Sequence, residues 1–202
     1  QGSGGTAMRH GHGSRKDEVD TDTERFFRVI DRGILEHYSQ PSGLPLMLAA
    51  LPEYHALFRS VSRNPHLLPA GITTNPDALT PEQLRAESWR RMEPLHQERI
   101  DTLILSYREA KSHGQGSDDL PGMAAAAAEG RIATLLVEAH RQVPGRILPG
   151  TGEIRASAMS DPDTDDVLDD LAEHVLRTKG EVVVVPGGQM PTRTGAAAIY
   201  RY

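Results

Sequence analysis

Two stretches of the sequence carry side chains that could do chemistry. The first lies near the start and joins flexible glycines to cationic and imidazole groups: Arg9, His10, Gly11, His12, Gly13, Arg15 and Lys16. The stretch has the composition of an exposed polar loop, which we expect to be mobile. His10 and His12 could also ligate a metal, but no third ligand follows at a suitable spacing, and we expect no metal site.

The second stretch is acidic and contains Asp165, Asp166, Asp169 and Asp170. A calcium loop would need alternating ligands, a central glycine and a distal glutamate, and these are missing. Carboxylates are favoured near the positive end of a helix, so the pattern predicts the solvated face of a helix.

Common catalytic motifs are missing from the sequence. It has no GxxxxGK[ST] phosphate loop, no GxSxG nucleophile elbow and no HExxH pair. The histidines are scattered, and the carboxylates gather only on the acidic helix. We therefore expect neither a hydrolase constellation nor a cofactor or metal, and we expect that the protein is not an enzyme.

The totals restrict the class of protein. The 202 residues carry a net charge of -6 and no cysteine, which excludes disulfides and thiolate sites and fits a reducing compartment such as the cytoplasm. A broad electrostatic grip on nucleic acid is not expected at this charge. No apolar run is long enough to span a membrane, so we predict no membrane association.

The hydrophobic spacing predicts an α/β protein. In the first half we expect a mobile segment at residues 1–22. We also expect two helices, at 23–38 and 53–63, and two strands, at 44–51 and 66–68. In the second half we expect a long helix from Thr80 to about His113 with a kink at Pro94, and an alanine-rich helix at 118–129. We expect a loop at 141–160, followed by a helix capped by Asp161. We expect strands at 131–137, 181–185 and 196–202. The valine strand at 181–185 is expected to be covered on both faces.

The order of these pieces resembles a known family. The stretches that carry the resemblance are Arg9-His10-Gly11-His12-Gly13 before a long helix, Gly130 to Val137 after an alanine helix, Lys179 to Val185, and Gly195 to Tyr202. Together they resemble the middle and C-terminal domains of the archaeo-eukaryotic class-1 release factor and Pelota superfamily, above all its bacterial relatives.

The resemblance implies a fold and a set of partners. Residues 1–79 would form the later part of a ribonuclease H-like α/β middle domain with a glycine-rich tip loop. Residues 80–202 would form an L7Ae-like three-layer α/β/α sandwich. It further implies a ribosomal partner, rRNA or tRNA, contacted by the tip loop. A translational GTPase could dock on the acidic helix.

The resemblance fails at the catalytic motif. Release factors carry Gly-Gly-Gln in the tip loop, where this chain has Gly11-His12-Gly13-Ser14. A Gly187-Gly188-Gln189 occurs elsewhere, in a turn after the valine strand, and glycine is common in such turns. We therefore expect a ribosome-associated factor for hibernation, rescue or translational stress, without peptide release.

Three alternatives remain open at this point. The ribonuclease H-like half could be a metal-dependent nuclease or hydrolase, for which Asp17, Glu18, Asp20 and Asp22 are the upstream acidic candidates. The second half could be a protein-interaction module. The chain could also be a structural scaffold.

Overall fold

The computed structural model describes residues 12–148, 150–156 and 164–202, and for residues 12–20 the backbone alone. The chain divides into two compact units, Gln1–Pro94 and Leu95–Tyr202. The division falls inside the long helix α4 (Pro81–Ser112), whereas the sequence placed the boundary at its start. The helix continues through Pro94. In the described part of the chain, no helix combines the length and apolarity that crossing a membrane requires.

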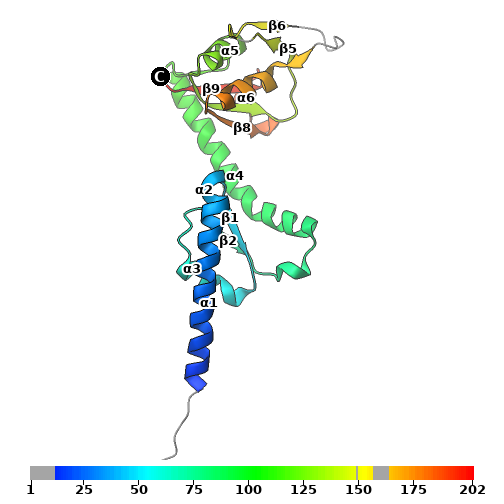
Figure 1. Ribbon diagram of the computed structural model, residues 1–202. Helices are drawn as coiled ribbons and strands as arrows, with labels where there is room; N and C mark the ends of the chain where they lie inside the picture. The colour runs from blue at the N-terminus through cyan, green and yellow to red at the C-terminus, as the bar shows by residue number, and fades with distance from the viewer. Residues whose placement is uncertain (1–11, 149, 157–163) are drawn as a thin grey trace, which may run out of the picture. The chain divides into compact units, whose positions relative to one another are not determined.

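Unit 1 is built from helices and a two-stranded parallel sheet (Figure 1). Its elements are α1 (His12–Ile34), a π-helical segment (Leu35–Ser39), α2 (Gln40–Ser42), β1 (Leu46–Ala49), α3 (Pro52–Val61), β2 (Leu67–Ile72) and a 3-10 turn (Pro76–Ala78). The first turns of α4 complete the unit. The predicted order of helix, strand, helix and strand is confirmed.

Two boundaries in unit 1 differ from prediction. The helix starts at His12, so the expected loop over residues 12–22 is wrong. No apolar period marks this part of the sequence, so the hydrophobic spacing gave no helix signal there. Strand β2 extends to Ile72 despite Pro69 and Gly71. The register slips between Leu67 and Gly71, and a strand tolerates proline at such an irregularity.

Aromatic contacts hold α1 against α3. The rings of Phe27 and Phe58 meet edge to face with centroids 5.4 Å apart, and Phe27 also meets Tyr54 at 6.0 Å. Phe58 is buried, whereas Phe26, predicted on the same stripe, is 60% exposed. At Gly71, a Cβ atom would lie 2.7 Å from the His55 ring, so only glycine fits there. The contacts of Phe27 thus hold the C-terminal half of α1 against α3.

Unit 2 has a central four-stranded sheet in the order β3-β9-β4-β8. Its strands are β3 (Gly116–Ser117), β4 (Ile132–Glu138), β8 (Glu181–Val185) and β9 (Ala196–Tyr200). Strands β4 and β8 run parallel, and β9 runs antiparallel to β4. The three longer strands were predicted. Strand β8 lies at the sheet edge with Val184 56% exposed, so the expectation of complete cover is wrong there.

Helices cover both faces of this sheet, which gives three layers. On one face, Ile100, Ile104 and Tyr107 of α4 pack against Leu136, Val183 and Val185. On the other face lie α5 (Leu120–Ala128) and α6 (Val167–Arg177). Ala126 and Ala127 of α5 and Ala196 to Ala198 of β9 are at most 1% exposed. Small side chains let helix and sheet approach closely, and the described core is correspondingly poor in aromatic residues.

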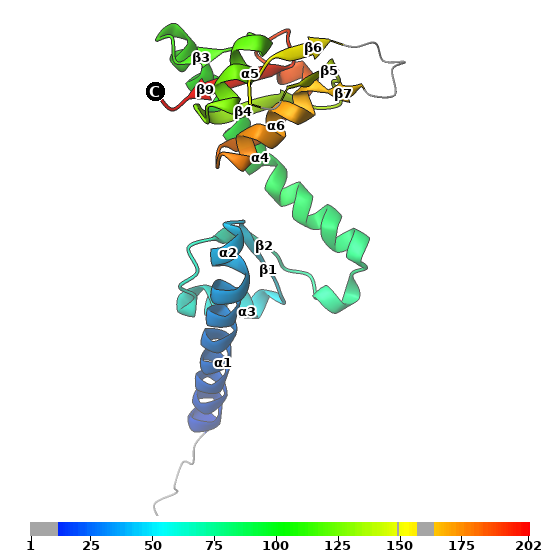
Figure 2. The same cartoon turned by 45° about the horizontal axis from the view of Figure 1, so that its top comes forward.

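A second, three-stranded sheet lies beside α6 (Figure 2). It consists of β5 (Pro144–Ile147), β6 (Ile154–Ala156) and β7 (Asp165–Asp166), in the order β6-β5-β7. The loop predicted at residues 141–160 is therefore wrong in part, because these strands are too short to show an alternating pattern.

The ends of α6 also differ from prediction in detail. Asp166 caps α6, which begins at Val167, whereas the predicted cap, Asp161, lies outside the described residues. At the other end, Lys179 adopts the left-handed conformation with φ 61°, and the Gly180 N–H returns to the Val175 carbonyl at 2.8 Å. The predicted end at Lys179-Gly180 is therefore close to the observed one.

One buried polar atom in unit 2 yields a prediction. The Tyr107 side chain is 2% exposed, and among the described residues its hydroxyl has no hydrogen-bond partner. Burial raises the pKa of this hydroxyl. A buried polar group without a partner costs about 1–3 kcal/mol, so Tyr107→Phe should leave the free energy of unfolding unchanged or raise it by up to about 1 kcal/mol.

Urea denaturation followed by circular dichroism measures this change. Ile100→Ala is the matched control from the same cluster, and it should cost about 2–5 kcal/mol because it opens a cavity. A loss of more than about 1 kcal/mol in Tyr107→Phe would mean that the hydroxyl is bonded in solution.

Candidate nucleic-acid interface

Helix α1 carries the predicted tip-loop residues at its start. His12, Gly13, Arg15 and Lys16 lie in its first turns, whereas Arg9, His10 and Gly11 lie outside the described residues. The same helix continues without a break from these cationic residues to Ile34.

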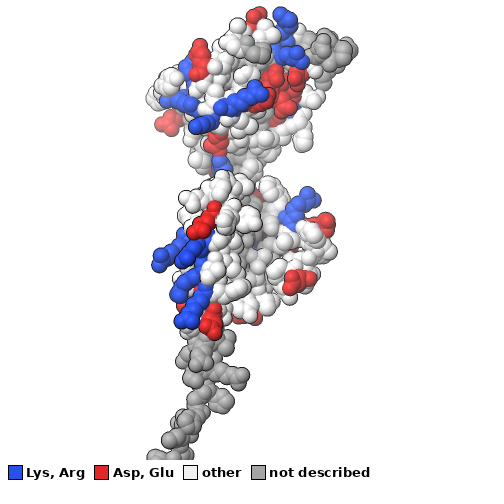
Figure 3. Space-filling view, viewed as in Figure 1, with Lys and Arg blue, Asp and Glu red and all other residues white. Residues whose placement is uncertain are grey.

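Arginines continue along the described part of α1. Arg25, Arg28 and Arg32 follow one another at spacings of three and four, which places them on neighbouring turns of one face. Arg28 is paired with Glu24 at 2.9 Å, and Arg25 lies 3.6 Å from Asp22. Figure 3 shows basic side chains gathered along this side of the helix. Exposed pairs of this kind are weak, so the arginines can exchange them for other anions.

A cleft opens beside this face, where α1 meets the end of α3. It has a volume of about 400 Å³, and its polar lining includes Arg28, Arg32 and Arg63 together with Ser60 and Ser62. The guanidinium groups of Arg32 and Arg63 are exposed and form no hydrogen bond or ion pair with the described residues. Three guanidinium groups around one hollow can bind a phosphate. The hydroxyls contribute no donor to it, because Ser60 donates to the Leu57 carbonyl and Ser62 donates to Asp31.

The floor of the cleft is fixed by a buried carboxylate. Asp31 is 4% exposed and accepts hydrogen bonds from Ser62 Oγ at 2.5 Å and from the Arg63 backbone N–H at 2.8 Å. Next to it, buried Asn64 donates to Ser39 Oγ at 2.8 Å. These bonds join α1 to the segment after α3, so the two sides of the cleft have a defined spacing.

The acidic candidates for a nuclease lie on the same helix. Asp17, Glu18, Asp20 and Asp22 fall within α1, whereas a ribonuclease H-like metal site would need ligands on adjacent strands. Among the side chains that the structure describes, three or more metal-ligating groups gather nowhere. These observations give the nuclease alternative no support.

The acidic residues of α6 divide into two kinds. Asp166 accepts hydrogen bonds from the Leu168 and Val143 N–H groups at 3.0 Å, and Asp170 accepts one from the Ile147 N–H at 2.8 Å. These two carboxylates hold α6 against β5. Asp165 and Asp169 are exposed and line a shallow cleft of about 380 Å³. Asp165 also accepts the Asp166 N–H at 3.0 Å, whereas the Asp169 carboxylate forms no hydrogen bond with the described residues. A partner could therefore use Asp169 without disturbing the fold.

Gly187-Gly188-Gln189 forms a short 3-10 turn after β8, as the turn prediction implied. The amide of Gln189 pairs with the amide of Gln97 through two hydrogen bonds of 2.9 Å. Gln97 also donates to Asp101 at 3.0 Å. The Gln189 side chain is therefore bound to α4, and it does not project alone into solvent as the glutamine of a tip loop would.

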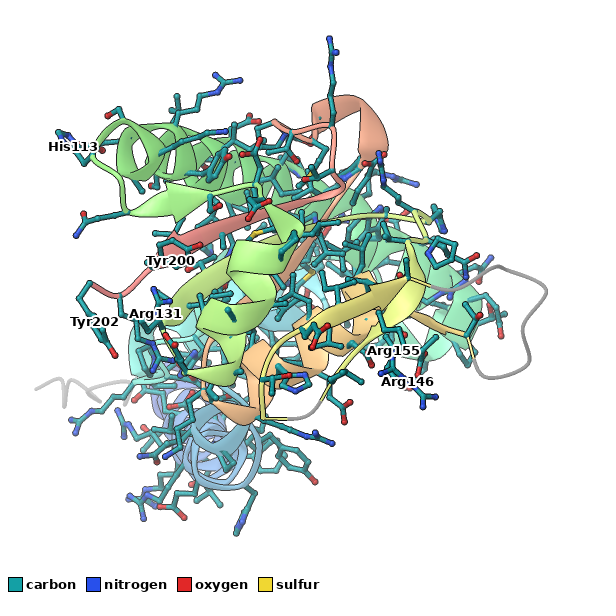
Figure 4. The ribbon with its side chains drawn as sticks, turned by 90° about the horizontal axis from the view of Figure 1, so that it is seen from above. His113, Arg131, Arg146, Arg155, Tyr200 and Tyr202 are labelled. Atoms are coloured by element: carbon teal, nitrogen blue, oxygen red, sulfur yellow. The ribbon has the colours of Figure 1, made fainter. Side chains whose placement is uncertain are left out.

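An aromatic and basic group at one end of the central sheet was missed by the sequence interpretation. The Arg131 guanidinium lies 5.6 Å from the centre of the Tyr200 ring, and Tyr202 is 74% exposed (Figure 4). The hydrogen bond from Arg131 to Glu129 raises the pKa of the guanidinium, which stays cationic. Tyrosines at alternate positions at the end of the chain, the half-buried Tyr200 and the exposed Tyr202, were the available signal, but alternation alone also suits a core.

The chain is similar to known proteins, both to a sequence family and to solved structures. Residues 2–131 match the family described as "Bacterial archaeo-eukaryotic release factor family 3". Archaeal Pelota, from a structure titled as ribosome-bound with ABCE1, has a TM-score of 0.59 and 14% identity over 88% of this chain and 49% of its own. No curated protein matches the sequence.

Two further solved structures are similar at lower scores. The C-terminal domain of the peptide chain release factor from Methanosarcina mazei gives 0.49 with 18% identity, covering 64% of this chain and 96% of its own. The archaeal translation termination factor aRF1 gives 0.34 with 15% identity, covering 96% and 54%. The likeness to Pelota shows a shared fold, and the chain spans about half the length of the Pelota and aRF1 chains.

The two kinds of aspartate on α6 yield a prediction. Asp166→Ala removes the helix cap and the bond to Val143, and should lower the free energy of unfolding by about 1–2 kcal/mol. Asp169→Ala, on the exposed side of the same turn, should change it by less than about 0.5 kcal/mol. Urea denaturation of both variants measures the difference. Equal losses would contradict the assignment of Asp166 to the fold.

Proposed function

Because the chain belongs to the bacterial archaeo-eukaryotic release factor family 3, we propose that it is a ribosome-associated translation factor that contacts ribosomal RNA through α1. The single observation that carries this proposal is the arginine cleft beside α1, with Arg28, Arg32 and Arg63 around it. A net charge of -6 opposes nonspecific binding to RNA, so a local basic site must supply the contact.

The proposal assigns a role to each unit. Unit 1 is the later part of a ribonuclease H-like middle domain, whose tip segment and α1 approach the RNA. Unit 2 is the L7Ae-like C-terminal domain, and its three layers support this assignment. The archaeal Pelota that shares this fold is ribosome-bound in its structure, which makes the ribosome the first partner to test. A factor acting there works in the cytoplasm.

The factor acts without peptide release. The tip segment has Gly11-His12-Gly13-Ser14 in place of Gly-Gly-Gln, and the Gln189 side chain is paired with Gln97. Neither place offers a free glutamine to orient a water molecule at an ester. We therefore assign the protein to ribosome hibernation, rescue or translational stress, as a binding factor rather than an enzyme.

A translational GTPase is the second partner that we propose. Asp165, in β7 just before α6, and Asp169, in the first turn of α6, offer it an exposed acidic surface. Charge reversal at these two positions should weaken capture of the GTPase while leaving ribosome binding through α1 intact.

The test of the main proposal is co-sedimentation of the chain with purified bacterial ribosomes. Binding should be saturable at about 150 mM salt, where only contacts within about 8 Å escape screening. Arg32→Gln together with Arg63→Gln should weaken it at least about tenfold, since each lost charged hydrogen bond is worth about 1.5 kcal/mol or more.

The matched control removes two charges from elsewhere in unit 1. Arg85 and Arg90 are exposed on α4, and their double change to Gln should leave ribosome binding within about twofold of the unchanged chain, because rim charges away from a contact contribute little. Equal weakening in both double variants would show a nonspecific charge effect and sink the α1 assignment.

A further inference from the structure

The β5–β6 hairpin of unit 2 places two arginines directly opposite each other. Strands β5 and β6 pair antiparallel, with Arg146 facing Arg155 between the Gly145–Ala156 and Ile147–Ile154 pairs. Cross-strand partners lie on the same face of a sheet, with Cβ atoms about 4.5–5.5 Å apart. Both side chains are exposed, and Figure 4 shows them next to each other beside the hairpin.

This arrangement costs stability unless an anion is bound. Like charges directly opposite on neighbouring strands repel. Neither guanidinium forms a hydrogen bond or ion pair with the described residues, although unit 2 is rich in carboxylates. By contrast, four other arginines of the unit are paired with acids: Arg99 with Glu181, Arg131 with Glu129, Arg141 with Glu138, and Arg177 with Glu173.

Core contacts and two carboxylates fix the backbone of the hairpin on its inner face. Ile147 is 3% exposed in the core cluster, and Ile154 packs against that cluster. The carboxylate of Asp170 accepts the Ile147 N–H, and that of Asp166 accepts the Val143 N–H just before β5. The backbone that carries the arginines is therefore fixed before any ligand arrives, which lowers the entropic cost of binding.

The chemistry of the pair favours a phosphate over an acidic peptide. Two planar guanidiniums offer paired donors that match phosphate oxygens. A protein partner would also require an apolar anchor at the centre of the contact. The neighbours of the pair are small, as Gly145 and Ala156 are, or are packed against the core, as Ile147 and Ile154 are.

We propose that Arg146 and Arg155 form a second phosphate-binding site for the RNA backbone, separate from the α1 cleft. Naming RNA as the source of the phosphate rests on the proposed function, but the site itself is argued from the hairpin alone. The pair positions the backbone and reads no bases, because guanidiniums on a flat exposed hairpin reach phosphates without entering a groove.

The test measures binding of the full chain to a fluorescein-labelled single-stranded RNA by anisotropy, with salt varied between about 50 and 200 mM. Each phosphate contact contributes about 0.7 to the slope of log K against log salt for single strands. Arg146→Gln with Arg155→Gln should therefore reduce the slope by about 1.4. Arg146→Lys with Arg155→Lys keeps both charges and should restore most of the slope.

A matched control removes two other exposed arginines of unit 2 whose guanidinium groups have no partner among the described residues. Arg108→Gln with Arg193→Gln lowers the net charge equally and should leave the slope unchanged. An unchanged slope in the Arg146 and Arg155 variant, or an equal drop in the control, would overturn the proposal. Displacement of the RNA by polyglutamate at equal charge concentration would show an acidic-protein site instead, and would also overturn it.

The two proposals fail in different ways. Loss of RNA binding only in the Arg32 and Arg63 variant would support the α1 cleft and refute the hairpin site. Loss only in the Arg146 and Arg155 variant would support the hairpin site and refute the cleft.

Discussion

The buried carboxylate of Asp31 is the constraint on which unit 1 depends. Its hydrogen bonds to Ser62 and to the Arg63 backbone join the middle of α1 to the segment that follows α3. Removing such an acceptor would leave buried donors unpaired, which costs about 1–3 kcal/mol for each group. The same bonds bring Arg63 within reach of Arg28 and Arg32, so one polar interaction both stabilises the unit and forms its arginine-lined cleft.

Unit 2 depends on the close packing of helices against both faces of its central sheet. Its sheet is covered by α4 on one face and by α5 and α6 on the other, with alanines at the closest approaches. The Asp166 and Asp170 carboxylates accept hydrogen bonds from backbone N–H groups before and within β5, and so hold this strand against α6. This leaves the opposite side of the hairpin free to carry Arg146 and Arg155, two charges that the core itself does not require.

Sequence patterns predicted the parts of this fold that local chemistry determines. The valine run of β8 and the alanine run of α5 identify their elements directly, and the cap and proline before α4 identify its start. The arginine cleft could not be predicted, because its two sides meet only through Asp31, far along the chain from Ser62. The Arg146–Arg155 pair depends on a strand register that short strands with Pro144 and Gly145 do not reveal.

The central claim is that α1 faces ribosomal RNA. A photoreactive benzophenone amino acid in place of Val29 tests it most directly, since Val29 is 70% exposed and lies one turn from both Arg25 and Arg32. The same group in place of Val184, which is 56% exposed on β8, serves as the control. On ribosomes, position 29 should crosslink to ribosomal RNA and position 184 should not. Crosslinks from position 29 to proteins alone, while the chain still co-sediments, would contradict the account.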